Sequence, residues 1–130
     1  ADWRVASAEK QKIKKQPGTN APQLTLAENP DILKTIAASG SQRPGLVVGF
    51  AAETDNVTDY AGRKLKSKNA DWIVANDVSP ETGIMGGDHN RVHLVSANGV
   101  EDWPQMSKEG VAEALIGRIA AHLHASKDAT

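Results

Sequence analysis

The sequence predicts an α/β fold, in which helices cover a sheet of buried strands, and three observations support this. Residues 46–52 form an apolar run without charge between Pro44-Gly45 and a polar turn, which is typical of a strand buried on both faces. Residues 72–77 form a second run, which ends in polar residues. Amphipathic helical segments lie between and after these runs, so strands and helices alternate along the chain.

The composition limits the class of protein. The chain has 130 residues and a net charge of −1, which fits a single domain and does not suggest a nucleic-acid-binding protein. It has no cysteine, no apolar run of membrane-spanning length and no start that reads as a signal peptide, so we expect a cytoplasmic protein without membrane contact. The first residue is Ala1 and the start reads like the end of a strand, which suggests a fragment of a longer chain.

Basic residues are concentrated in two places. Eight of the fifteen Lys and Arg residues lie in two clusters, which are Lys10, Lys12, Lys14 and Lys15, and Arg63, Lys64, Lys66 and Lys68. Local positive charge favours a compact anion such as a nucleotide phosphate over a long polyanion. The alternative for each cluster is a solvated face, which is what most charge runs form.

The first third of the chain predicts a flap and a helix. Residues 9–28 contain the first lysine cluster, a Pro17-Gly18 turn and a short strand at 24–26, and we expect them to form a lysine-bearing flap hairpin. Asn29-Pro30-Asp31 is typical of a helix start, because Asn caps free backbone N–H groups and Pro tolerates the first helical position. The inward side chains that we expect for this helix are Ile32, Leu33 and Ile36.

A second helix is predicted from about Asn56 to Asn69, after the small and polar residues that end the first buried strand. Open α/β sheets bind ligands beyond such strand ends, although an ordinary strand followed by a helix cap has the same pattern. Lys64 and Lys68 stand one turn apart, where like charges cost about a few tenths of a kcal/mol unless an anion relieves them. The inward side chains expected here are Val57, Tyr60, Ala61 and Leu65.

The last third predicts a loop, a strand and a helix. Residues 78–90, with Gly83, Gly86 and Gly87, form a loop long enough to be functional. Residues 91–95 alternate and predict a strand near a sheet edge with one exposed face, which puts His93 on the surface. Neither His89 with Asp88 nor His122 with His124 has further ligands at spacings that suit a metal. The final helix is expected to begin at Ser107 and to bury Val111, Leu115, Ile119 and Leu123.

Short motifs carry the interpretation further. The chain contains neither a GxGxxG turn nor a P-loop. Residue chemistry alone therefore indicates a site for an anion or a nucleotide, but it does not identify a reaction. The motifs in question are Ala1-Asp2-Trp3, Lys12-Ile13-Lys14-Lys15, Asn29-Pro30-Asp31-Ile32-Leu33, Gly49-Phe50-Ala51-Ala52-Glu53-Thr54, Lys64-Leu65-Lys66-Ser67-Lys68, Ala75-Asn76-Asp77-Val78 and Ser107-Lys108-Glu109. In order and spacing they resemble the C-terminal part of phosphopantothenate–cysteine ligases, the CTP-dependent half of bacterial bifunctional decarboxylase/ligases of coenzyme A biosynthesis.

The resemblance implies a Rossmann-like three-layer fold, of which this chain is the C-terminal half, with a mostly parallel sheet. It divides the chain into the flap 9–28, a nucleotide-binding helix–strand–helix core 29–78, and a loop, edge strand and C-terminal helix 79–130. The N-terminal part of the ligase domain, with its glycine-rich turn and an asparagine linked to the acyl-cytidylate, has no counterpart here. The FMN-dependent decarboxylase has none either, so FMN is expected only outside this chain.

The resemblance also implies a reaction. CTP, accompanied by Mg²⁺, activates the carboxylate of 4′-phosphopantothenate as an acyl-cytidylate, and L-cysteine then displaces CMP. The family is typically a homodimer, and the missing N-terminal portion as a separate chain is another expected partner. Lys12 is the candidate catalytic residue, and metal ligands are not assigned. Carried over by motif, the CTP contacts are Asp2, Lys12, Pro30, Asp31, Ile32, Leu33, Phe50, Lys64 and Lys68.

Two other interpretations remain open at the level of sequence. One is a non-catalytic nucleotide-binding or dimerisation module, active only with its missing half. The other is a different Rossmann-like protein, an oxidoreductase, which is disfavoured because no fingerprint glycines and ribose-binding acid appear at the proper spacing.

Overall fold

The computed structural model describes residues 2–7, 12–18, 20–79 and 87–129. The chain forms two compact units, Ala1–Ile32 and Leu33–Thr130, and each is described by itself. Of the predicted loop 78–90, residues 80–86, with Gly83 and Gly86, lie outside the described residues, as do Lys10 and the tip residue 19 of the flap.

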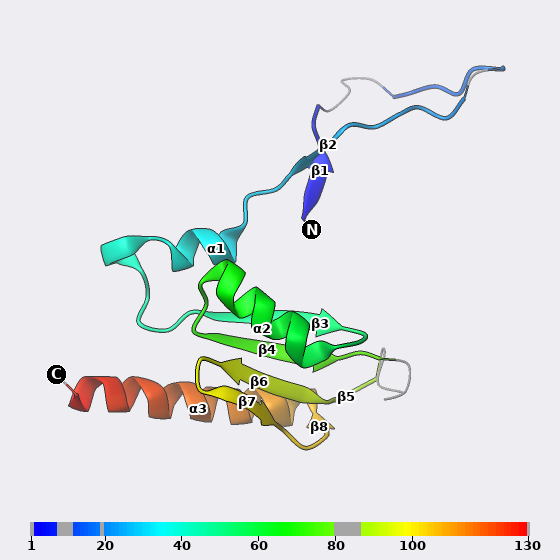
Figure 1. The fold of residues 1–130 in the computed structure, drawn as a ribbon. Coiled ribbons are helices and arrows are strands. Elements are labelled where there is room, and N and C mark those ends of the chain that lie inside the picture. The colour runs from blue at the N-terminus through cyan, green and yellow to red at the C-terminus, as the bar shows by residue number, and fades with distance from the viewer. Residues whose placement is uncertain (1, 8–11, 19, 80–86, 130) are drawn as a thin grey trace. The chain divides into compact units, whose positions relative to one another are not determined.

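The first unit is a hairpin. β1 (Trp3–Val5) pairs antiparallel with β2 (Leu26–Glu28), and the register joins Trp3 to Glu28. Beyond this ladder the two described arms continue toward a turn in which Gly18 has a φ of 77°, a value that favours glycine (Figure 1). The strand predicted at 24–26 is therefore displaced, since the ladder begins at Leu26. The backbone N–H of Ala6 donates to the Thr25 carbonyl at 2.8 Å and extends the pairing by one bond into that segment.

The second unit is built on a four-stranded sheet. Its strands are β3 (Val48–Glu53), β4 (Trp72–Asp77), β6 (Val92–Ser96) and β7 (Gly99–Asp102), in that order across the sheet. β3 and β4 are parallel, as expected for strands joined through a helix, and the other two pairs are antiparallel. The predicted α/β class is confirmed, and this part of the sheet is mixed. A separate short pair joins β5 (His89–Asn90) to β8 (Met106–Ser107).

Helices cover both faces of the sheet and give three layers (Figure 1). They are α1 (Ile32–Ala37), followed by the short 3₁₀ turn η1 (Gly40–Gln42), then α2 (Val57–Lys68) and α3 (Lys108–Asp128). Two apolar clusters fill the space between the layers. One packs Trp72, Val74, Val92 and Leu94 against Val111 and Leu115 of α3. The other packs Ile73, Ala75 and Val95 against Ala61 of α2 and Leu33 of α1.

α2 matches its predicted span. Asn56 and Asn69 flank it, and both adopt the left-handed backbone region that asparagine tolerates, at φ 43° and φ 55°. Ala61 is fully buried, and Val57 and Leu65 pack against the sheet as predicted. Tyr60 was expected to face inward and does not. Its ring is exposed, and the Arg63 guanidinium lies 5.6 Å from its centroid.

α1 is shorter than predicted and buries a narrower face. It begins at Ile32, so Pro30 precedes the helix and does not occupy its first position. Leu33 and Ala37 face the core, whereas Ile32 and Ile36, expected to be inward, are exposed. Leu33 packs closely on the sheet because Gly49 has no side chain. A Cβ there would lie 2.6 Å from Leu33 Cδ2 and 2.9 Å from Ile73 Cδ1.

α3 starts where the sequence predicts. Ser107 caps it, and its Oγ accepts a hydrogen bond from the Gly110 N–H at 3.0 Å. Val111 and Leu115 are buried and Ile119 packs against the same cluster, but the expected burial of Leu123 is wrong. The reason is length, since the C-terminal part of α3 runs past the end of the strands (Figure 1).

The predictions for residues 91–95 are wrong in position and exposure. β6 lies inside the sheet between β4 and β7, and Val92 to Val95 are all buried. His93 is 8% exposed and is not a surface residue. Its Nδ1 pairs with Asp102 Oδ1 of β7, which satisfies the buried ring. The edge strand of this part of the chain is β7, which the sequence analysis did not assign.

Candidate nucleotide-binding site

The second unit brings two of the predicted nucleotide contacts together. Lys64 Nζ on α2 donates a hydrogen bond to the Phe50 backbone carbonyl on β3 at 2.9 Å. The Phe50 side chain is 57% exposed, although it lies in the middle of the strand. β3 is an edge strand of the described sheet, so this pair lies at an open edge. Lys68, half-buried, is one turn further along the same helix.

Phe50 is exposed because of the face on which it lies. Successive strand residues alternate between faces, so Phe50 and Ala52 share a face with Val48, which packs in the cluster under α3. α3 packs mainly on β4 and β6 residues and leaves the face of β3 open at Phe50. The ring thus stands on one side of the sheet edge while Lys64 reaches that edge from the helix on the other side.

Asn76 is a further candidate residue, one that the sequence did not point to. The register pairs it with Ala52 at the carboxyl end of β4, on the same face as Phe50. Among the described residues, its Oδ1 is a buried side-chain atom without a hydrogen-bond partner. An unpaired buried acceptor costs roughly 1–3 kcal/mol, so this atom is a candidate acceptor for a ligand N–H. The only signal in the sequence is that a buried strand ends in polar residues.

Asp77 follows at the same strand end. Its Oδ1 accepts a hydrogen bond from the Ser79 backbone N–H at 3.0 Å, and its own backbone N–H donates to the Arg91 carbonyl. Hydrogen bonding to the Ser79 side chain is the main reason that the pKa of Asp77 is below its ordinary value, with smaller contributions from the Ser79 backbone, His93 and Arg91. This end of β4 therefore keeps a fixed negative charge.

The first unit carries other predicted residues. The Asn29 N–H donates to the Asp2 carbonyl at 2.8 Å, which places Asp2 beside the segment that contains Pro30 and Asp31. The Arg4 guanidinium fixes the same corner by donating to the Glu28 carbonyl at 2.5 Å. Asp2 is thus bonded to Asn29, the residue before Pro30, at the base of the hairpin. Ile32, the last residue of this unit, is 74% exposed.

The flap lysines lie on the arms of the hairpin. Lys12 is exposed and lies outside any strand or helix. Lys14 and Lys15 line a cavity of about 590 Å³ between the two arms. Alternation along a regular extended arm would put Lys12 and Lys14 on one side and Lys15 on the other. The described arm is not a regular strand, and Lys14 and Lys15 face the same cavity.

Leu33 has a different role from the other predicted contacts. Its side chain packs against the core formed by Ile73 and Ala75, so the side chain is committed to the fold.

In the part of the chain that the structure describes, no three His, Cys, Asp or Glu residues gather in a way that suits a metal ion. No helix in the same ranges is both long and apolar enough to cross a bilayer.

The decisive comparison is with a family of domains. The DNA/pantothenate metabolism flavoprotein C-terminal domain family matches residues 1–123, which is most of the chain. The chain belongs to this family. Its resemblance to the C-terminal part of the bifunctional coenzyme A biosynthesis proteins, which the motifs indicated, is confirmed.

Relatives of the family domain support the same assignment. The coenzyme A biosynthesis bifunctional protein CoaBC of Escherichia coli K12 is 44% identical over 121 residues, and that of Bacillus subtilis 168 is 38% identical over 122 residues. These matches cover 92% and 93% of this chain but only 29% of each relative. This chain therefore spans less than a third of the length of those proteins.

Solved structures agree on the fold. The crystal structure of a C-terminal domain of CoaBC matches with a TM-score of 0.62 and 36% identity, over 78% of this chain and 45% of that one. The DNA/pantothenate metabolism flavoprotein of Streptococcus pneumoniae matches with a TM-score of 0.64 and 26% identity, over 84% and 46%. Both likenesses cover the larger part of this chain and less than half of the other.

Proposed function

We propose that this chain supplies the CTP-handling part of a phosphopantothenate–cysteine ligase of coenzyme A biosynthesis. The observation that carries the proposal is the pairing of Lys64 with Phe50 at an open sheet edge, in a domain whose relatives are coenzyme A biosynthesis proteins. At this edge Lys64 supplies a cation for phosphate from one side of the sheet, and Phe50 supplies an exposed aromatic ring for the base on the other side.

The proposed reaction has two steps. A carboxylate oxygen of 4′-phosphopantothenate attacks the α-phosphorus of CTP, pyrophosphate leaves, and an acyl-cytidylate forms. The amine of L-cysteine then attacks the acyl carbon, the amide forms, and CMP leaves. Every bond change occurs on the substrates, so the protein contributes positioning and charge stabilisation.

Lys64 and Lys68 are proposed to bind the triphosphate. As point charges on one helical face they neutralise phosphate oxygens without demanding a fixed direction. Lys64 donates to the Phe50 carbonyl, and in the complex it would exchange this partner for a phosphate oxygen. The exposed Phe50 ring would pack against the cytosine, and Asn76 Oδ1 would accept a hydrogen bond from the bound ligand.

Lys12 is proposed to complete the charge around the phosphates from the flap, which makes it the candidate catalytic residue. An exposed lysine on an extended arm remains solvated until substrate arrives, and closure over the phosphates would expel water and strengthen the charge interaction. Asp2, which is bonded to Asn29, and the Pro30-Asp31 segment that follows Asn29 are the other proposed contacts in this unit.

Mg²⁺ belongs to the proposal as part of the substrate. The described residues hold no group of metal-binding side chains, so we treat the ion as entering with the triphosphate. FMN chemistry and the homodimer that the resemblance implies stay expectations.

Calorimetric titration of the complete protein with CTP, ATP and NADH, each with Mg²⁺, tests the proposal. We expect CTP to bind most tightly, and adding 4′-phosphopantothenate and L-cysteine should release CMP and pyrophosphate in equal amounts. Binding of CTP without product would favour a non-catalytic nucleotide-binding module. A preference for NADH would contradict the ligase assignment.

A further inference from the structure

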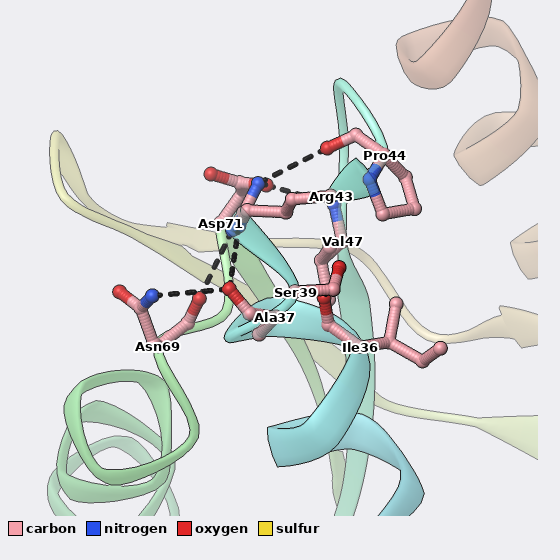
Figure 2. Close-up of polar contacts among 8 residues, drawn as sticks. All are labelled: Ile36, Ala37, Ser39, Arg43, Pro44, Val47, Asn69 and Asp71. Carbon is pink, nitrogen blue, oxygen red and sulfur yellow. Dashed lines mark hydrogen bonds and ion pairs between the residues drawn. The ribbon is translucent and has the colours of Figure 1, made fainter. Parts of the chain in front are cut away.

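A cluster of polar contacts joins four elements at the end of the sheet where β3 and β4 begin (Figure 2). Its centre is Arg43, in the segment between η1 and β3. The guanidinium donates to the Ala37 carbonyl through Nε and to the Asn69 carbonyl through a terminal nitrogen, both at 3.0 Å. Its other terminal nitrogen donates to Asp71 Oδ2 at 3.0 Å. We call Arg43, Asn69 and Asp71 the clamp.

The clamp also contains bonds that do not involve Arg43. Asp71 Oδ2 accepts a second hydrogen bond, from the Val47 N–H at 2.7 Å, one residue before β3. Asn69 Nδ2 donates to the Ala37 carbonyl at 3.3 Å. The clamp therefore ties the last residue of α1, the residue after α2, and the residues that precede β3 and β4.

The chemistry requires arginine at this position. The last carbonyls of a helix lack intrahelical partners and carry partial negative charge, and here the ends of α1 and α2 are held by one cation. Three donors in one plane reach two carbonyls and a carboxylate simultaneously. A lysine ammonium at the end of a flexible stem does not present its donors in this fixed fork.

The clamp is next in sequence to the candidate site. Asn69 directly follows Lys68, so the backbone carbonyl that Arg43 holds belongs to the residue that caps the last turn of α2. Lys64, one turn earlier, has its own attachment to β3 through the Phe50 carbonyl. The clamp thus holds the backbone next to Lys68, and the Phe50 carbonyl of β3 holds the side chain of Lys64.

We propose that Arg43 is a positioning residue for nucleotide binding, which acts through Lys68. By holding the end of α2 against α1 and the start of β3, Arg43 keeps the last turn of α2 helical. It thereby fixes the position of Lys68 relative to β3. This inference rests on the proposed function, since it assumes that Lys68 contacts the triphosphate. Arg43 itself need not touch the ligand.

A double-mutant cycle on the complete protein tests the inference, with the Kd for Mg²⁺–CTP measured by calorimetry. Arg43→Lys should raise this Kd by roughly tenfold, the size of one lost charge-assisted contact. Lys68→Ala should raise it by a similar factor. If Arg43 acts through Lys68, adding Arg43→Lys to Lys68→Ala should change the Kd less than about twofold, because coupled residues are not additive.

Arg118→Lys is the matched control, because Arg118 pairs with Glu101 on the other face of the sheet and has no contact with the clamp. Both Arg→Lys variants should lower the Tm, but only Arg43→Lys should weaken CTP binding. If Arg43→Lys does not fold, Asp71→Asn replaces it in the cycle, since it removes the charge that pairs with Arg43 and keeps an acceptor for the Val47 N–H.

The outcomes separate the two proposals. The positioning role would be overturned if Arg43→Lys raised the Kd by the same factor in the wild-type protein and in Lys68→Ala, or did not change the Kd at all. Either result would leave the proposed function intact. An unchanged Kd for Lys68→Ala would instead show that the triphosphate contact has been misassigned.

Discussion

At the scale of single residues, His93 illustrates what an alternating pattern does not reveal. Its neighbours alternate with polar residues, which predicts an exposed face, yet the ring is buried in β6 and pairs with Asp102. The partner lies on the next strand, nine residues away, and only the hairpin register brings the two together. Burial of a titratable side chain depends on such long-range pairing, so sequence periodicity could not show it.

A second ion pair on β7 leads to a prediction about pH. Glu101 accepts hydrogen bonds from Arg118 and from Trp103 Nε1, and the Arg118 hydrogen bond is the main cause that lowers the pKa of Glu101 below its usual 4.5. A carboxylate whose pKa is lower in the folded state adds stability above its unfolded pKa, and loses it as pH falls through the folded value.

We therefore expect the Tm of the complete protein to exceed that of Glu101→Gln at pH 7, and the difference to shrink as the pH falls below about 4.5. Thermal melts of both proteins between pH 7 and pH 3 measure this. The Gln variant keeps an acceptor for both partners but does not titrate. A difference that stays constant across this range would show that the charge of Glu101 adds nothing.

At the scale of elements, local signals were strong where one face of an element is buried. α2, β4 and the start of α3 lie within a residue or so of their predicted bounds, because apolar stripes and asparagine or serine caps fix them. β7 and the pair of β5 with β8 were missed, since strands of two to four residues carry little periodicity. Exposure of Tyr60 and Leu123 depends on how far the sheet extends, which the pattern of one helix does not contain.

The contact between α1 and β3 makes a testable element-scale prediction. Gly49→Ala should destabilise the protein by about 1–3 kcal/mol, because a methyl group there overlaps Leu33 and Ile73 in a closed core. Gly117→Ala is the control, as a Cβ at this position of α3 meets nothing within 4 Å, and it should stabilise the helix by about 0.5–1 kcal/mol. Urea unfolding measures both. A neutral Gly49→Ala would mean that α1 shifts freely on the sheet.

At the scale of the whole molecule, the two units share the predicted site residues between them. Motif order pointed to all of these residues, and in the second unit Lys64 contacts the Phe50 backbone carbonyl. Their role as nucleotide contacts stays a prediction. Asn76 and the clamp could not be predicted from the sequence. Asn76 is identified by an unpaired buried atom, and the clamp by four chain segments that come together only in the fold. The chain covers about 29% of its bifunctional relatives, so the remaining contacts to substrate are proposals for the complete protein.

We propose that Lys64 and Lys68, on one face of α2, bind the triphosphate of CTP. The most direct test is the Kd for Mg²⁺–CTP, measured by calorimetry on the Lys64→Ala, Lys68→Ala double variant of the complete protein. Each charge-assisted contact contributes roughly 1.5–3 kcal/mol, so the Kd for Mg²⁺–CTP should rise about a hundredfold or more. The Tm should change little, since removal of a like-charge pair offsets the lost hydrogen bond from Lys64 to the Phe50 carbonyl. Lys66→Ala, an exposed charge in the same turn, should change the Kd less than about threefold. A double variant that keeps wild-type affinity would contradict the account and reduce these lysines to a solvated face.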